Sequence, residues 1–536
     1  MSDPAAAPTE RDVLGLLMLA FEGETIPGWL ETWLADAPPA GFTLFRHHNV
    51  RSPGQLRELT GALQAAAPAG LPFLVAADQE GGQFQALGEG PTQFAGAMAL
   101  GAAGDVTLAE RVGRAIGTEL AAMGVNVCYA PVADVAVDRT NPALGIRSFG
   151  ADAAAVAGMV AATVRGIQSA GVAATVKHFP GKGAVAVDTH HALGIVDHDR
   201  ARLDAVELAP FRAAIEAGVG LVMSGHFAVP VLTGDPGLPA TLARDVMTGL
   251  LRDELGFGSV AITDALDMRA LDQGPNQVLD ALAALGAGVD LLLLATDPAG
   301  RERIGLGLRH AARRRLLEGA AVRASLARVA SLRRRFAGAA ATGPERPDLS
   351  VVGSSAHRAL SRELAERSVT LVRDEAGLLP LRLDPDRRIL AVMPRPADLT
   401  PADTSSTVPP GLAAALRAVH PAVDEIVLDG EPNDATIAAV RDRASSAGAV
   451  AIGTIAATAG SGQARLVEAV LATGVPTITV ALRTPWDLAA YPDAPTHLCT
   501  YSVLPDPLAA LAEVIAGRLV PGGRLPVPLD AVAAGR

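Results

Sequence analysis

Eight short apolar segments, separated by segments with helical patterns, dominate the first part of this 536-residue chain. Nearly continuous apolar strands that alternate with helices are typical of a parallel sheet that is covered on both faces. Eight such strands within roughly 300 residues predict a (β/α)8 TIM-like barrel. The expected strands are residues 15–21, 41–45, 73–77, 125–130, 172–176, 219–223, 260–263 and 289–295.

A second series of strands and helices follows a segment rich in Gly, Pro and small residues. We place the barrel domain at residues 1–340, the linker at 341–350 and a smaller open α/β sandwich domain at 351–536. Five apolar segments of the second domain predict an open parallel sheet. They are residues 388–393, 425–428, 449–455, 477–482 and 497–503.

Composition narrows the class of protein. A net charge of -12 argues against a nucleic-acid partner, and the arginine-rich helical stretch at 301–336 is expected to be a solvated face. Cys128 and Cys499 lie far apart in apolar segments, so no disulfide framework is implied. We see neither a secretory signal nor an apolar run of the roughly 20 residues that a membrane span requires. The expectation is a cytoplasmic monomer or homodimer with no membrane partner.

Polar side chains follow the predicted barrel strands, at the end of the barrel where such folds place their chemistry. One of these would more often be a helix cap or a loop residue, but together they predict a polar mouth. They are Glu22, Arg46, His47, Asp78, Glu80, Asp134, Lys177, His178, Ser224, His226, Asp264 and Asp297.

The loop KHFPGKGAVAVDTHH, residues 177–191, holds the only two lysines of the chain, Lys177 and Lys182. A compact ammonium suits a small polar ligand. Asp188 and His190 are two residues apart, so in extended chain the carboxylate can raise the pKa of the imidazole and make it a general acid. A solvated surface loop is the plain alternative, and a metal site formed by His178, Asp188, His190 and His191 is another.

Several motifs give the chain a specific resemblance. In order they are DQEGG (78–82), APVADV (130–135), NPALGIRSFG (141–150), KHFPGKG (177–183), DTH (188–190), MSGH (223–226), PATL (239–242) and ITDALDM (262–268). SVTLVRDEAGLLPL (368–381) and GGRLPV (522–527) continue the series in the second domain. The chain resembles glycoside hydrolase family 3, in its two-domain β-N-acetylglucosaminidase branch.

The resemblance implies roles for individual residues. Asp264 matches the nucleophile of a retaining glycosidase, with Asp267 as the nearby rival, and His190 backed by Asp188 matches the acid/base. Asp78, Arg147, Lys177 and His178 resemble the residues that hold the sugar hydroxyls. Lys182, Met223 and His226 lie in the same motifs and complete the candidate substrate-binding set. No cofactor or metal is implied.

Departures from the family pattern concern the substrate. Lys182 stands where a His is usual, Ala184 and Val185 replace Asp and Thr, and Gln83 and Ala86 replace two arginines. We predict a retaining exo-β-N-acetylhexosaminidase that acts on amino-sugar conjugates. The alternatives are a phosphorylase, a β-glucosidase whose acid/base is a second-domain Glu such as Glu375 or Glu431, and a non-catalytic sugar-binding protein.

Overall fold

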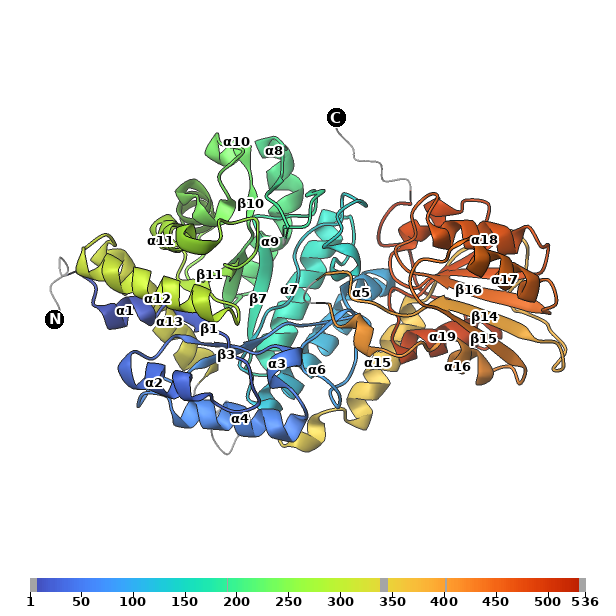
Figure 1. Cartoon of the computed structure of the whole chain (residues 1–536), viewed down its shortest axis with the longest axis horizontal. Helices are drawn as coiled ribbons and strands as arrows, with labels where there is room; N and C mark the ends of the chain where they lie inside the picture. Colours follow the sequence, from blue (N-terminus) through green and yellow to red (C-terminus); the bar gives the residue numbers. More distant parts are fainter. Residues whose placement is uncertain (1–6, 190, 338–345, 401–402, 530–536) are drawn as a thin grey trace.

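The structure, a computed structural model, describes residues 7–189, 191–337, 346–400 and 403–529. It contains a closed barrel and a separate sheet with its own helices (Figure 1). His190 and residues 341–345 of the predicted linker lie outside the described residues.

The eight expected barrel strands are all present, and the predicted TIM-like fold is confirmed. They are hydrogen-bonded in the order β1-β12-β11-β9-β7-β6-β3-β2 and close on themselves. Their burial on both faces explains the continuous apolar sequence. Their bounds are β1 Leu17–Leu19, β2 Gly41–Thr43, β3 Leu74–Ala77, β6 Val127–Cys128, β7 Ala173–Phe179, β9 Leu221–Ser224, β11 Val260–Ala265 and β12 Leu291–Leu293.

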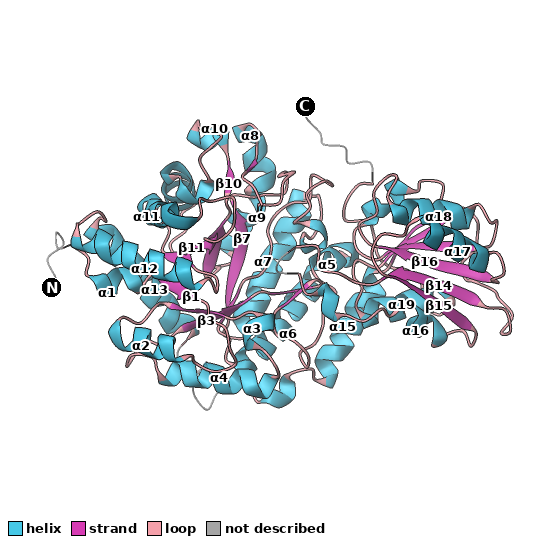
Figure 2. Ribbon diagram, in the orientation of Figure 1, coloured by secondary structure: helices cyan, strands magenta, loops and turns pink. Residues whose placement is uncertain are grey.

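Helices surround this barrel, as Figure 2 shows. The capping residues fix several of them: Asp105 accepts from the amides of Thr107 and Leu108 at the start of α6, and Gly124 ends that helix in the left-handed conformation. The helices are α1 Glu10–Leu14, α2 Gly28–Asp36, α3 Arg46–Asn49, α4 Pro53–Ala65, α5 Ala97–Ala103, α6 Val106–Met123, α7 Ala153–Ser169, α8 Arg200–Arg202, α9 Ala209–Glu216, α10 Pro230–Thr233, α11 Gln277–Ala287, α12 Pro298–Arg313 and α13 Gly319–Phe336. Two π-helical segments, Leu203–Glu207 and Asp245–Glu254, and two minor strands, β8 Gly194–Ile195 and β10 Phe227–Ala228, complete this part of the chain.

The end of α13 contributes to the barrel core. Leu332 and Phe336 belong to the same buried cluster as the inward-facing side chains of the strands. Arg333, which we expected on a solvated face, donates to the carbonyl of Pro39 at 2.9 Å, and burial lowers its pKa to about 10. The helix therefore closes the amino end of the barrel, and that expectation was wrong for Arg333.

The second domain holds a six-stranded sheet in the order β13-β18-β17-β16-β14-β15. The five predicted strands are parallel: β14 Ile389–Pro394, β15 Val423–Leu428, β16 Ala449–Thr454, β17 Thr477–Ala481 and β18 Thr496–Cys499. An additional edge strand, β13 Thr370–Asp374, pairs antiparallel with β18, so the sheet is mixed rather than purely parallel. Its helices are α15 Ser355–Ser368, α16 Leu412–Arg417, α17 Asp434–Ala444, α18 Gly462–Leu471 and α19 Pro505–Ile515.

The two domains share buried side chains and backbone hydrogen bonds. Ala481, Trp486 and Tyr501 of the second domain belong to the main hydrophobic cluster of the barrel domain. The terminal segment also lies against the barrel domain, where the Pro526 carbonyl accepts from the amide of Ala151 at 2.9 Å. The second domain is thus packed on the barrel rather than tethered to it.

Candidate active site

Four charged side chains form a buried chain of ion pairs at the carboxyl ends of β3 and β7. The Lys177 ammonium lies 2.7 Å from Asp78 Oδ1 and 2.7 Å from Glu80 Oε1. Arg147 donates to both carboxylate oxygens of Glu80, through Nη2 at 2.8 Å and Nε at 2.9 Å. Two cations therefore balance two carboxylates. Only Asp78 is open to solvent, with a side chain 25% exposed against 3% for Lys177.

The two carboxylates of this group titrate in opposite directions. Burial alone would raise the pKa of Glu80, but Arg147 and Lys177 outweigh it and lower that pKa to about 2. Burial raises the pKa of Asp78, which has the Lys177 ammonium as its close cation and is repelled by Glu80. Glu80 is therefore the fixed anion of the group, and Asp78 is the carboxylate that is partly open to solvent.

A short hairpin carries Glu80. It consists of β4 Gln79–Gly81 and β5 Phe84–Gln85, paired antiparallel. Gly81 and Gly82 have φ values of 86° and 60°, which residues with a side chain rarely adopt, and this explains the GG of the motif. The ring of Phe84 lies 4.2 Å from the guanidinium carbon of Arg147.

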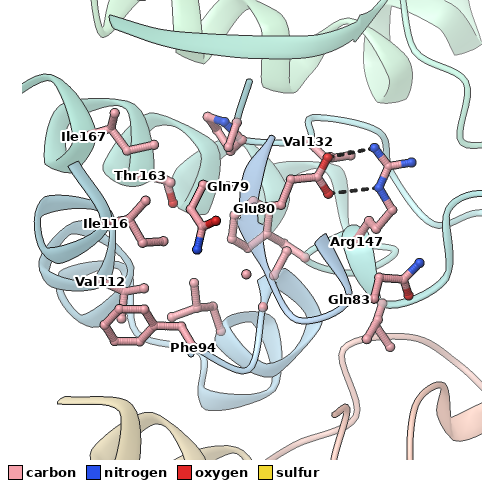
Figure 3. A pocket seen from close by; sticks show the side chains of 18 residues that line it. Gln79, Glu80, Gln83, Phe94, Val112, Ile116, Val132, Arg147, Thr163 and Ile167 are labelled. Atoms are coloured by element: carbon pink, nitrogen blue, oxygen red, sulfur yellow. Dashed lines mark hydrogen bonds and ion pairs between the residues drawn. The ribbon is translucent and has the colours of Figure 1, made fainter. Parts of the chain in front are cut away.

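The Glu80–Arg147 pair borders a pocket lined mainly by apolar side chains (Figure 3). Phe94, Val112 and Ile116 lie along it. Apolar surroundings weaken the competition from water, so they strengthen this ion pair. The position of Arg147 is consequently fixed by the carboxylate of Glu80 and by the ring of Phe84.

A second buried group is centred on Asp134. Its Oδ2 lies 2.8 Å from Nδ1 of His178, and its Oδ1 accepts from the backbone amide of Lys182 at 2.7 Å. Burial raises the pKa of Asp134, against the effect of the Lys182 ammonium. Burial also lowers the pKa of Lys182, and the positive charge of Arg147 adds to that effect. Asp134 therefore orients His178 and anchors the loop that carries Lys182.

Asp264 is at the carboxyl end of β11. Its side chain is 17% exposed and its Oδ2 lies 3.9 Å from Nε2 of His178. The next residue, Ala265, donates its amide to Asp264 Oδ1 at 2.9 Å. Asp267, the rival nucleophile, is exposed two residues beyond the end of the strand. Asp264 is therefore the acidic residue that faces His178 across the barrel mouth.

His226 supports this strand end instead of reaching the solvent. It is fully buried, its Nε2 lies 3.1 Å from the carbonyl of Ala265, and its Nδ1 lies 2.9 Å from the hydroxyl of Thr241. Burial lowers the pKa of His226. Because a carbonyl only accepts, Nε2 carries the proton of the neutral ring. His226 thus contacts the backbone beside Asp264.

The predicted acid/base lies partly outside the described residues. His190 is not described, while Asp188, two residues before it, is half-buried and has contacts of its own. The alternative metal site depends on the same undescribed histidine. Among the described residues, no three His, Cys, Asp or Glu side chains are grouped to hold a metal ion.

Other predicted positions have different surroundings. Met223 is buried in the barrel interior and is aligned with Lys177 of the neighbouring strand. Asp297 caps α12 by accepting from the amides of Ala299 and Gly300, the plain role for such a residue. Glu80 was noted only as a polar residue of the mouth, although its place in the DQEGG motif could have marked it as the partner of Arg147.

Comparison with known proteins agrees with the family that the sequence motifs indicate. The Glycosyl hydrolase family 3 N terminal domain matches residues 22–332. A solved glycoside hydrolase family 3 β-N-acetylglucosaminidase from Paenibacillus sp. str. FPU-7 superposes with a TM-score of 0.90 and is 35% identical, covering 98% of this chain and 100% of that one. A closed eight-stranded barrel with a polar mouth at the carboxyl ends of its strands is the arrangement typical of (β/α)8 enzymes. Within it, this chain belongs to glycoside hydrolase family 3, as its motifs predicted.

The alignments with curated relatives cover different shares of the length of each relative. Beta-hexosaminidase A of Pseudoalteromonas piscicida is 35% identical over 382 residues, 67% of this chain and 63% of that protein. Beta-hexosaminidase of Stenotrophomonas maltophilia (strain K279a) is 37% identical over 286 residues, 52% of this chain and 83% of that protein. This chain thus spans less than two thirds of the first relative. Within the described residues, no helix has both the length and the apolar character needed to cross a membrane.

Proposed function

We propose that this chain is a retaining exo-β-N-acetylhexosaminidase that acts on amino-sugar conjugates in the cytoplasm. The observation that carries the proposal is the position of Asp264, a partly exposed carboxylate at the end of β11 that faces His178. The relatives named beta-hexosaminidase and the Paenibacillus β-N-acetylglucosaminidase support the choice of an amino sugar.

Asp264 would attack the anomeric carbon and displace the leaving group. The carboxylate forms a bond to C1 as the glycosidic C–O bond breaks through an oxocarbenium-like transition state. His190, backed by Asp188, gives its proton to the departing oxygen. In the second half, the same imidazole removes a proton from water, which attacks C1 and releases Asp264 with net retention.

The sugar hydroxyls would be held by Asp78 together with Lys177. Asp78 is the exposed end of the ion-pair chain, so its free oxygen can accept from a hydroxyl. Arg147 is occupied on both sides by Glu80 and Ala143 and is nearly buried, so its main role is to fix that chain. His178, oriented by Asp134, and Lys182 would border the sugar nearer to Asp264.

A glucosidase-type acid/base from the second domain has less support. The contacts described for Glu375 and Glu431 lie within that domain: Glu375 is 3.5 Å from Arg373, and Glu431 accepts from Gln463 at 2.9 Å. The chemistry is therefore assigned to the barrel domain.

Turnover of para-nitrophenyl β-N-acetylglucosaminide and para-nitrophenyl β-glucoside, each with and without phosphate, tests the proposal. We expect a preference for the N-acetyl sugar and release of the free sugar at a rate independent of phosphate. A glycosyl phosphate product would make the protein a phosphorylase. Binding of N-acetylglucosamine without turnover of either glycoside would show a sugar-binding protein instead.

A further inference from the structure

A loop of the second domain is hydrogen-bonded to the hairpin that carries Glu80. The carbonyl of Gln83 accepts from the amide of Thr404 at 2.8 Å and from its hydroxyl at 2.9 Å. The same hydroxyl accepts from the amide of Gln85 at 3.3 Å. Gln83 is at the edge of the pocket in Figure 3. Thr404 therefore holds the hairpin turn at two points.

The loop around Thr404 is itself anchored in the second domain. Asp403, fully buried, accepts from the amide of Ser405 at 2.8 Å and from Arg483 at 3.1 Å. Arg483 also donates to the hydroxyl of Ser405. These residues follow β14 and β17, at the carboxyl ends of the parallel strands, where open α/β sheets place their functional loops. The buried ion pair between Arg483 and Asp403 thus fixes the position of the neighbouring Thr404.

The hairpin needs this support. Its two strands are short, with an irregular register between Gln79 and Gly81, and an isolated two-stranded hairpin is marginally stable. It nevertheless holds Arg147 from two directions, through Glu80 and through the ring of Phe84. A displaced hairpin would move both supports at once and would release Lys177 from Glu80.

We infer that Thr404 is a positioning residue of the active site, by which the second domain fixes the sugar-binding group of the barrel. The inference rests on the proposed function. The contacts that link the two domains run from Arg483 and Asp403 through Thr404 to the hairpin. Glu80 of the hairpin then contacts Arg147 and Lys177. The second domain would therefore contribute to substrate affinity by supporting the hairpin.

Thr404→Val removes the hydroxyl and keeps the shape and the backbone amide, whereas Thr404→Ser keeps both donors. A misplacement of about 1 Å can cost roughly 100-fold, and one donor remains in the Val variant, so we expect KM to rise about tenfold. The group binds the sugar in the ground state and in the transition state, so kcat should stay within about twofold. The Ser variant should behave as wild type.

Thr477→Val is the matched control, because the hydrogen bond described for the hydroxyl of this buried threonine lies within the second domain, to the carbonyl of Val475 at 2.8 Å. KM and kcat would be measured on para-nitrophenyl β-N-acetylglucosaminide, with N-acetylglucosamine affinity by calorimetry and the Tm of each variant. An unchanged KM in Thr404→Val, or an equal rise in Thr477→Val or Thr404→Ser, would overturn the inference and leave the proposed function intact. If the wild type showed no turnover and no binding of N-acetylglucosamine, both the inference and the proposed function would be overturned.

Discussion

Glu80 offers a quantitative test of the ion-pair chain. Its pKa falls from 4.5 to about 2 because Arg147 and Lys177 outweigh the effect of burial. At about 1.4 kcal/mol per pKa unit, this corresponds to roughly 3 kcal/mol of stability at neutral pH. Loss of one partner from a buried ion pair typically costs about 3–5 kcal/mol, which agrees. Glu80→Gln should therefore lower the free energy of unfolding by about 3 kcal/mol.

The pH dependence has a definite sign. A carboxylate whose pKa is lowered on folding stabilises the folded state above its unfolded pKa, and this contribution is lost as the pH falls through the folded pKa. For Glu80 the loss occurs between pH 4.5 and about pH 2. Denaturant unfolding at pH 7 and at pH 3 should therefore show a smaller difference in Glu80→Gln than in the wild type.

The chain contains a matched control for this experiment. Glu363 makes a bidentate pair with Arg111 at 2.8 Å and 2.8 Å, much like the pair between Glu80 and Arg147, but with side chains 34% and 50% exposed. Exposed pairs contribute about 0–1 kcal/mol, so Glu363→Gln should have a small effect. Equal losses in the two variants would refute the argument that burial makes the Glu80 pair strong.

Four further substitutions separate the roles of other residues. Asp264→Asn should lower kcat by about 10⁴-fold or more by removing the proposed nucleophile, whereas Asp267→Asn should keep activity, both measured with the para-nitrophenyl substrate. Lys182→Met should raise the denaturation midpoint, since burial lowers the pKa of Lys182 and disfavours its charge, while KM also rises. His226→Ala removes one of the two donors to the Ala265 carbonyl and leaves the amide of Met268 at 3.2 Å, so it should cost about 1 kcal/mol in urea unfolding and lower kcat; an unchanged kcat would contradict its support of the proposed nucleophile.

The barrel could be predicted from sequence because its strands are buried on both faces, so each appears as a continuous apolar segment. The antiparallel strand β13 could not. It lies at the sheet edge, and after Thr370 its residues are exposed or half-buried, including Arg373 and Asp374. An edge strand with that burial does not produce an apolar segment.

The residues of the candidate site that could be named from the sequence are those whose chemistry depends on the type of side chain. Asp78, Lys177, His178 and Asp264 follow predicted strands and take their expected roles from the family resemblance, and the structure brings them to one end of the barrel. Asp134 was visible as a polar residue after a strand and as part of the APVADV motif. Its contact with the amide of Lys182 is one that no side-chain pattern reveals.

Two of the contacts that sequence reasoning missed, those of Thr404 and His226, share a physical property: their acceptors are backbone carbonyls. Thr404 donates to the carbonyl of Gln83, 321 positions earlier, and His226 contacts the carbonyl of Ala265. Every residue has a carbonyl, so the identity of the accepting residue carries no information about the bond. This also explains how Gln83 can stand where the family usually has an arginine without loss of the contact between domains. The side chain at position 83 can therefore vary, while the Gln83 carbonyl keeps the hairpin attached to the second domain.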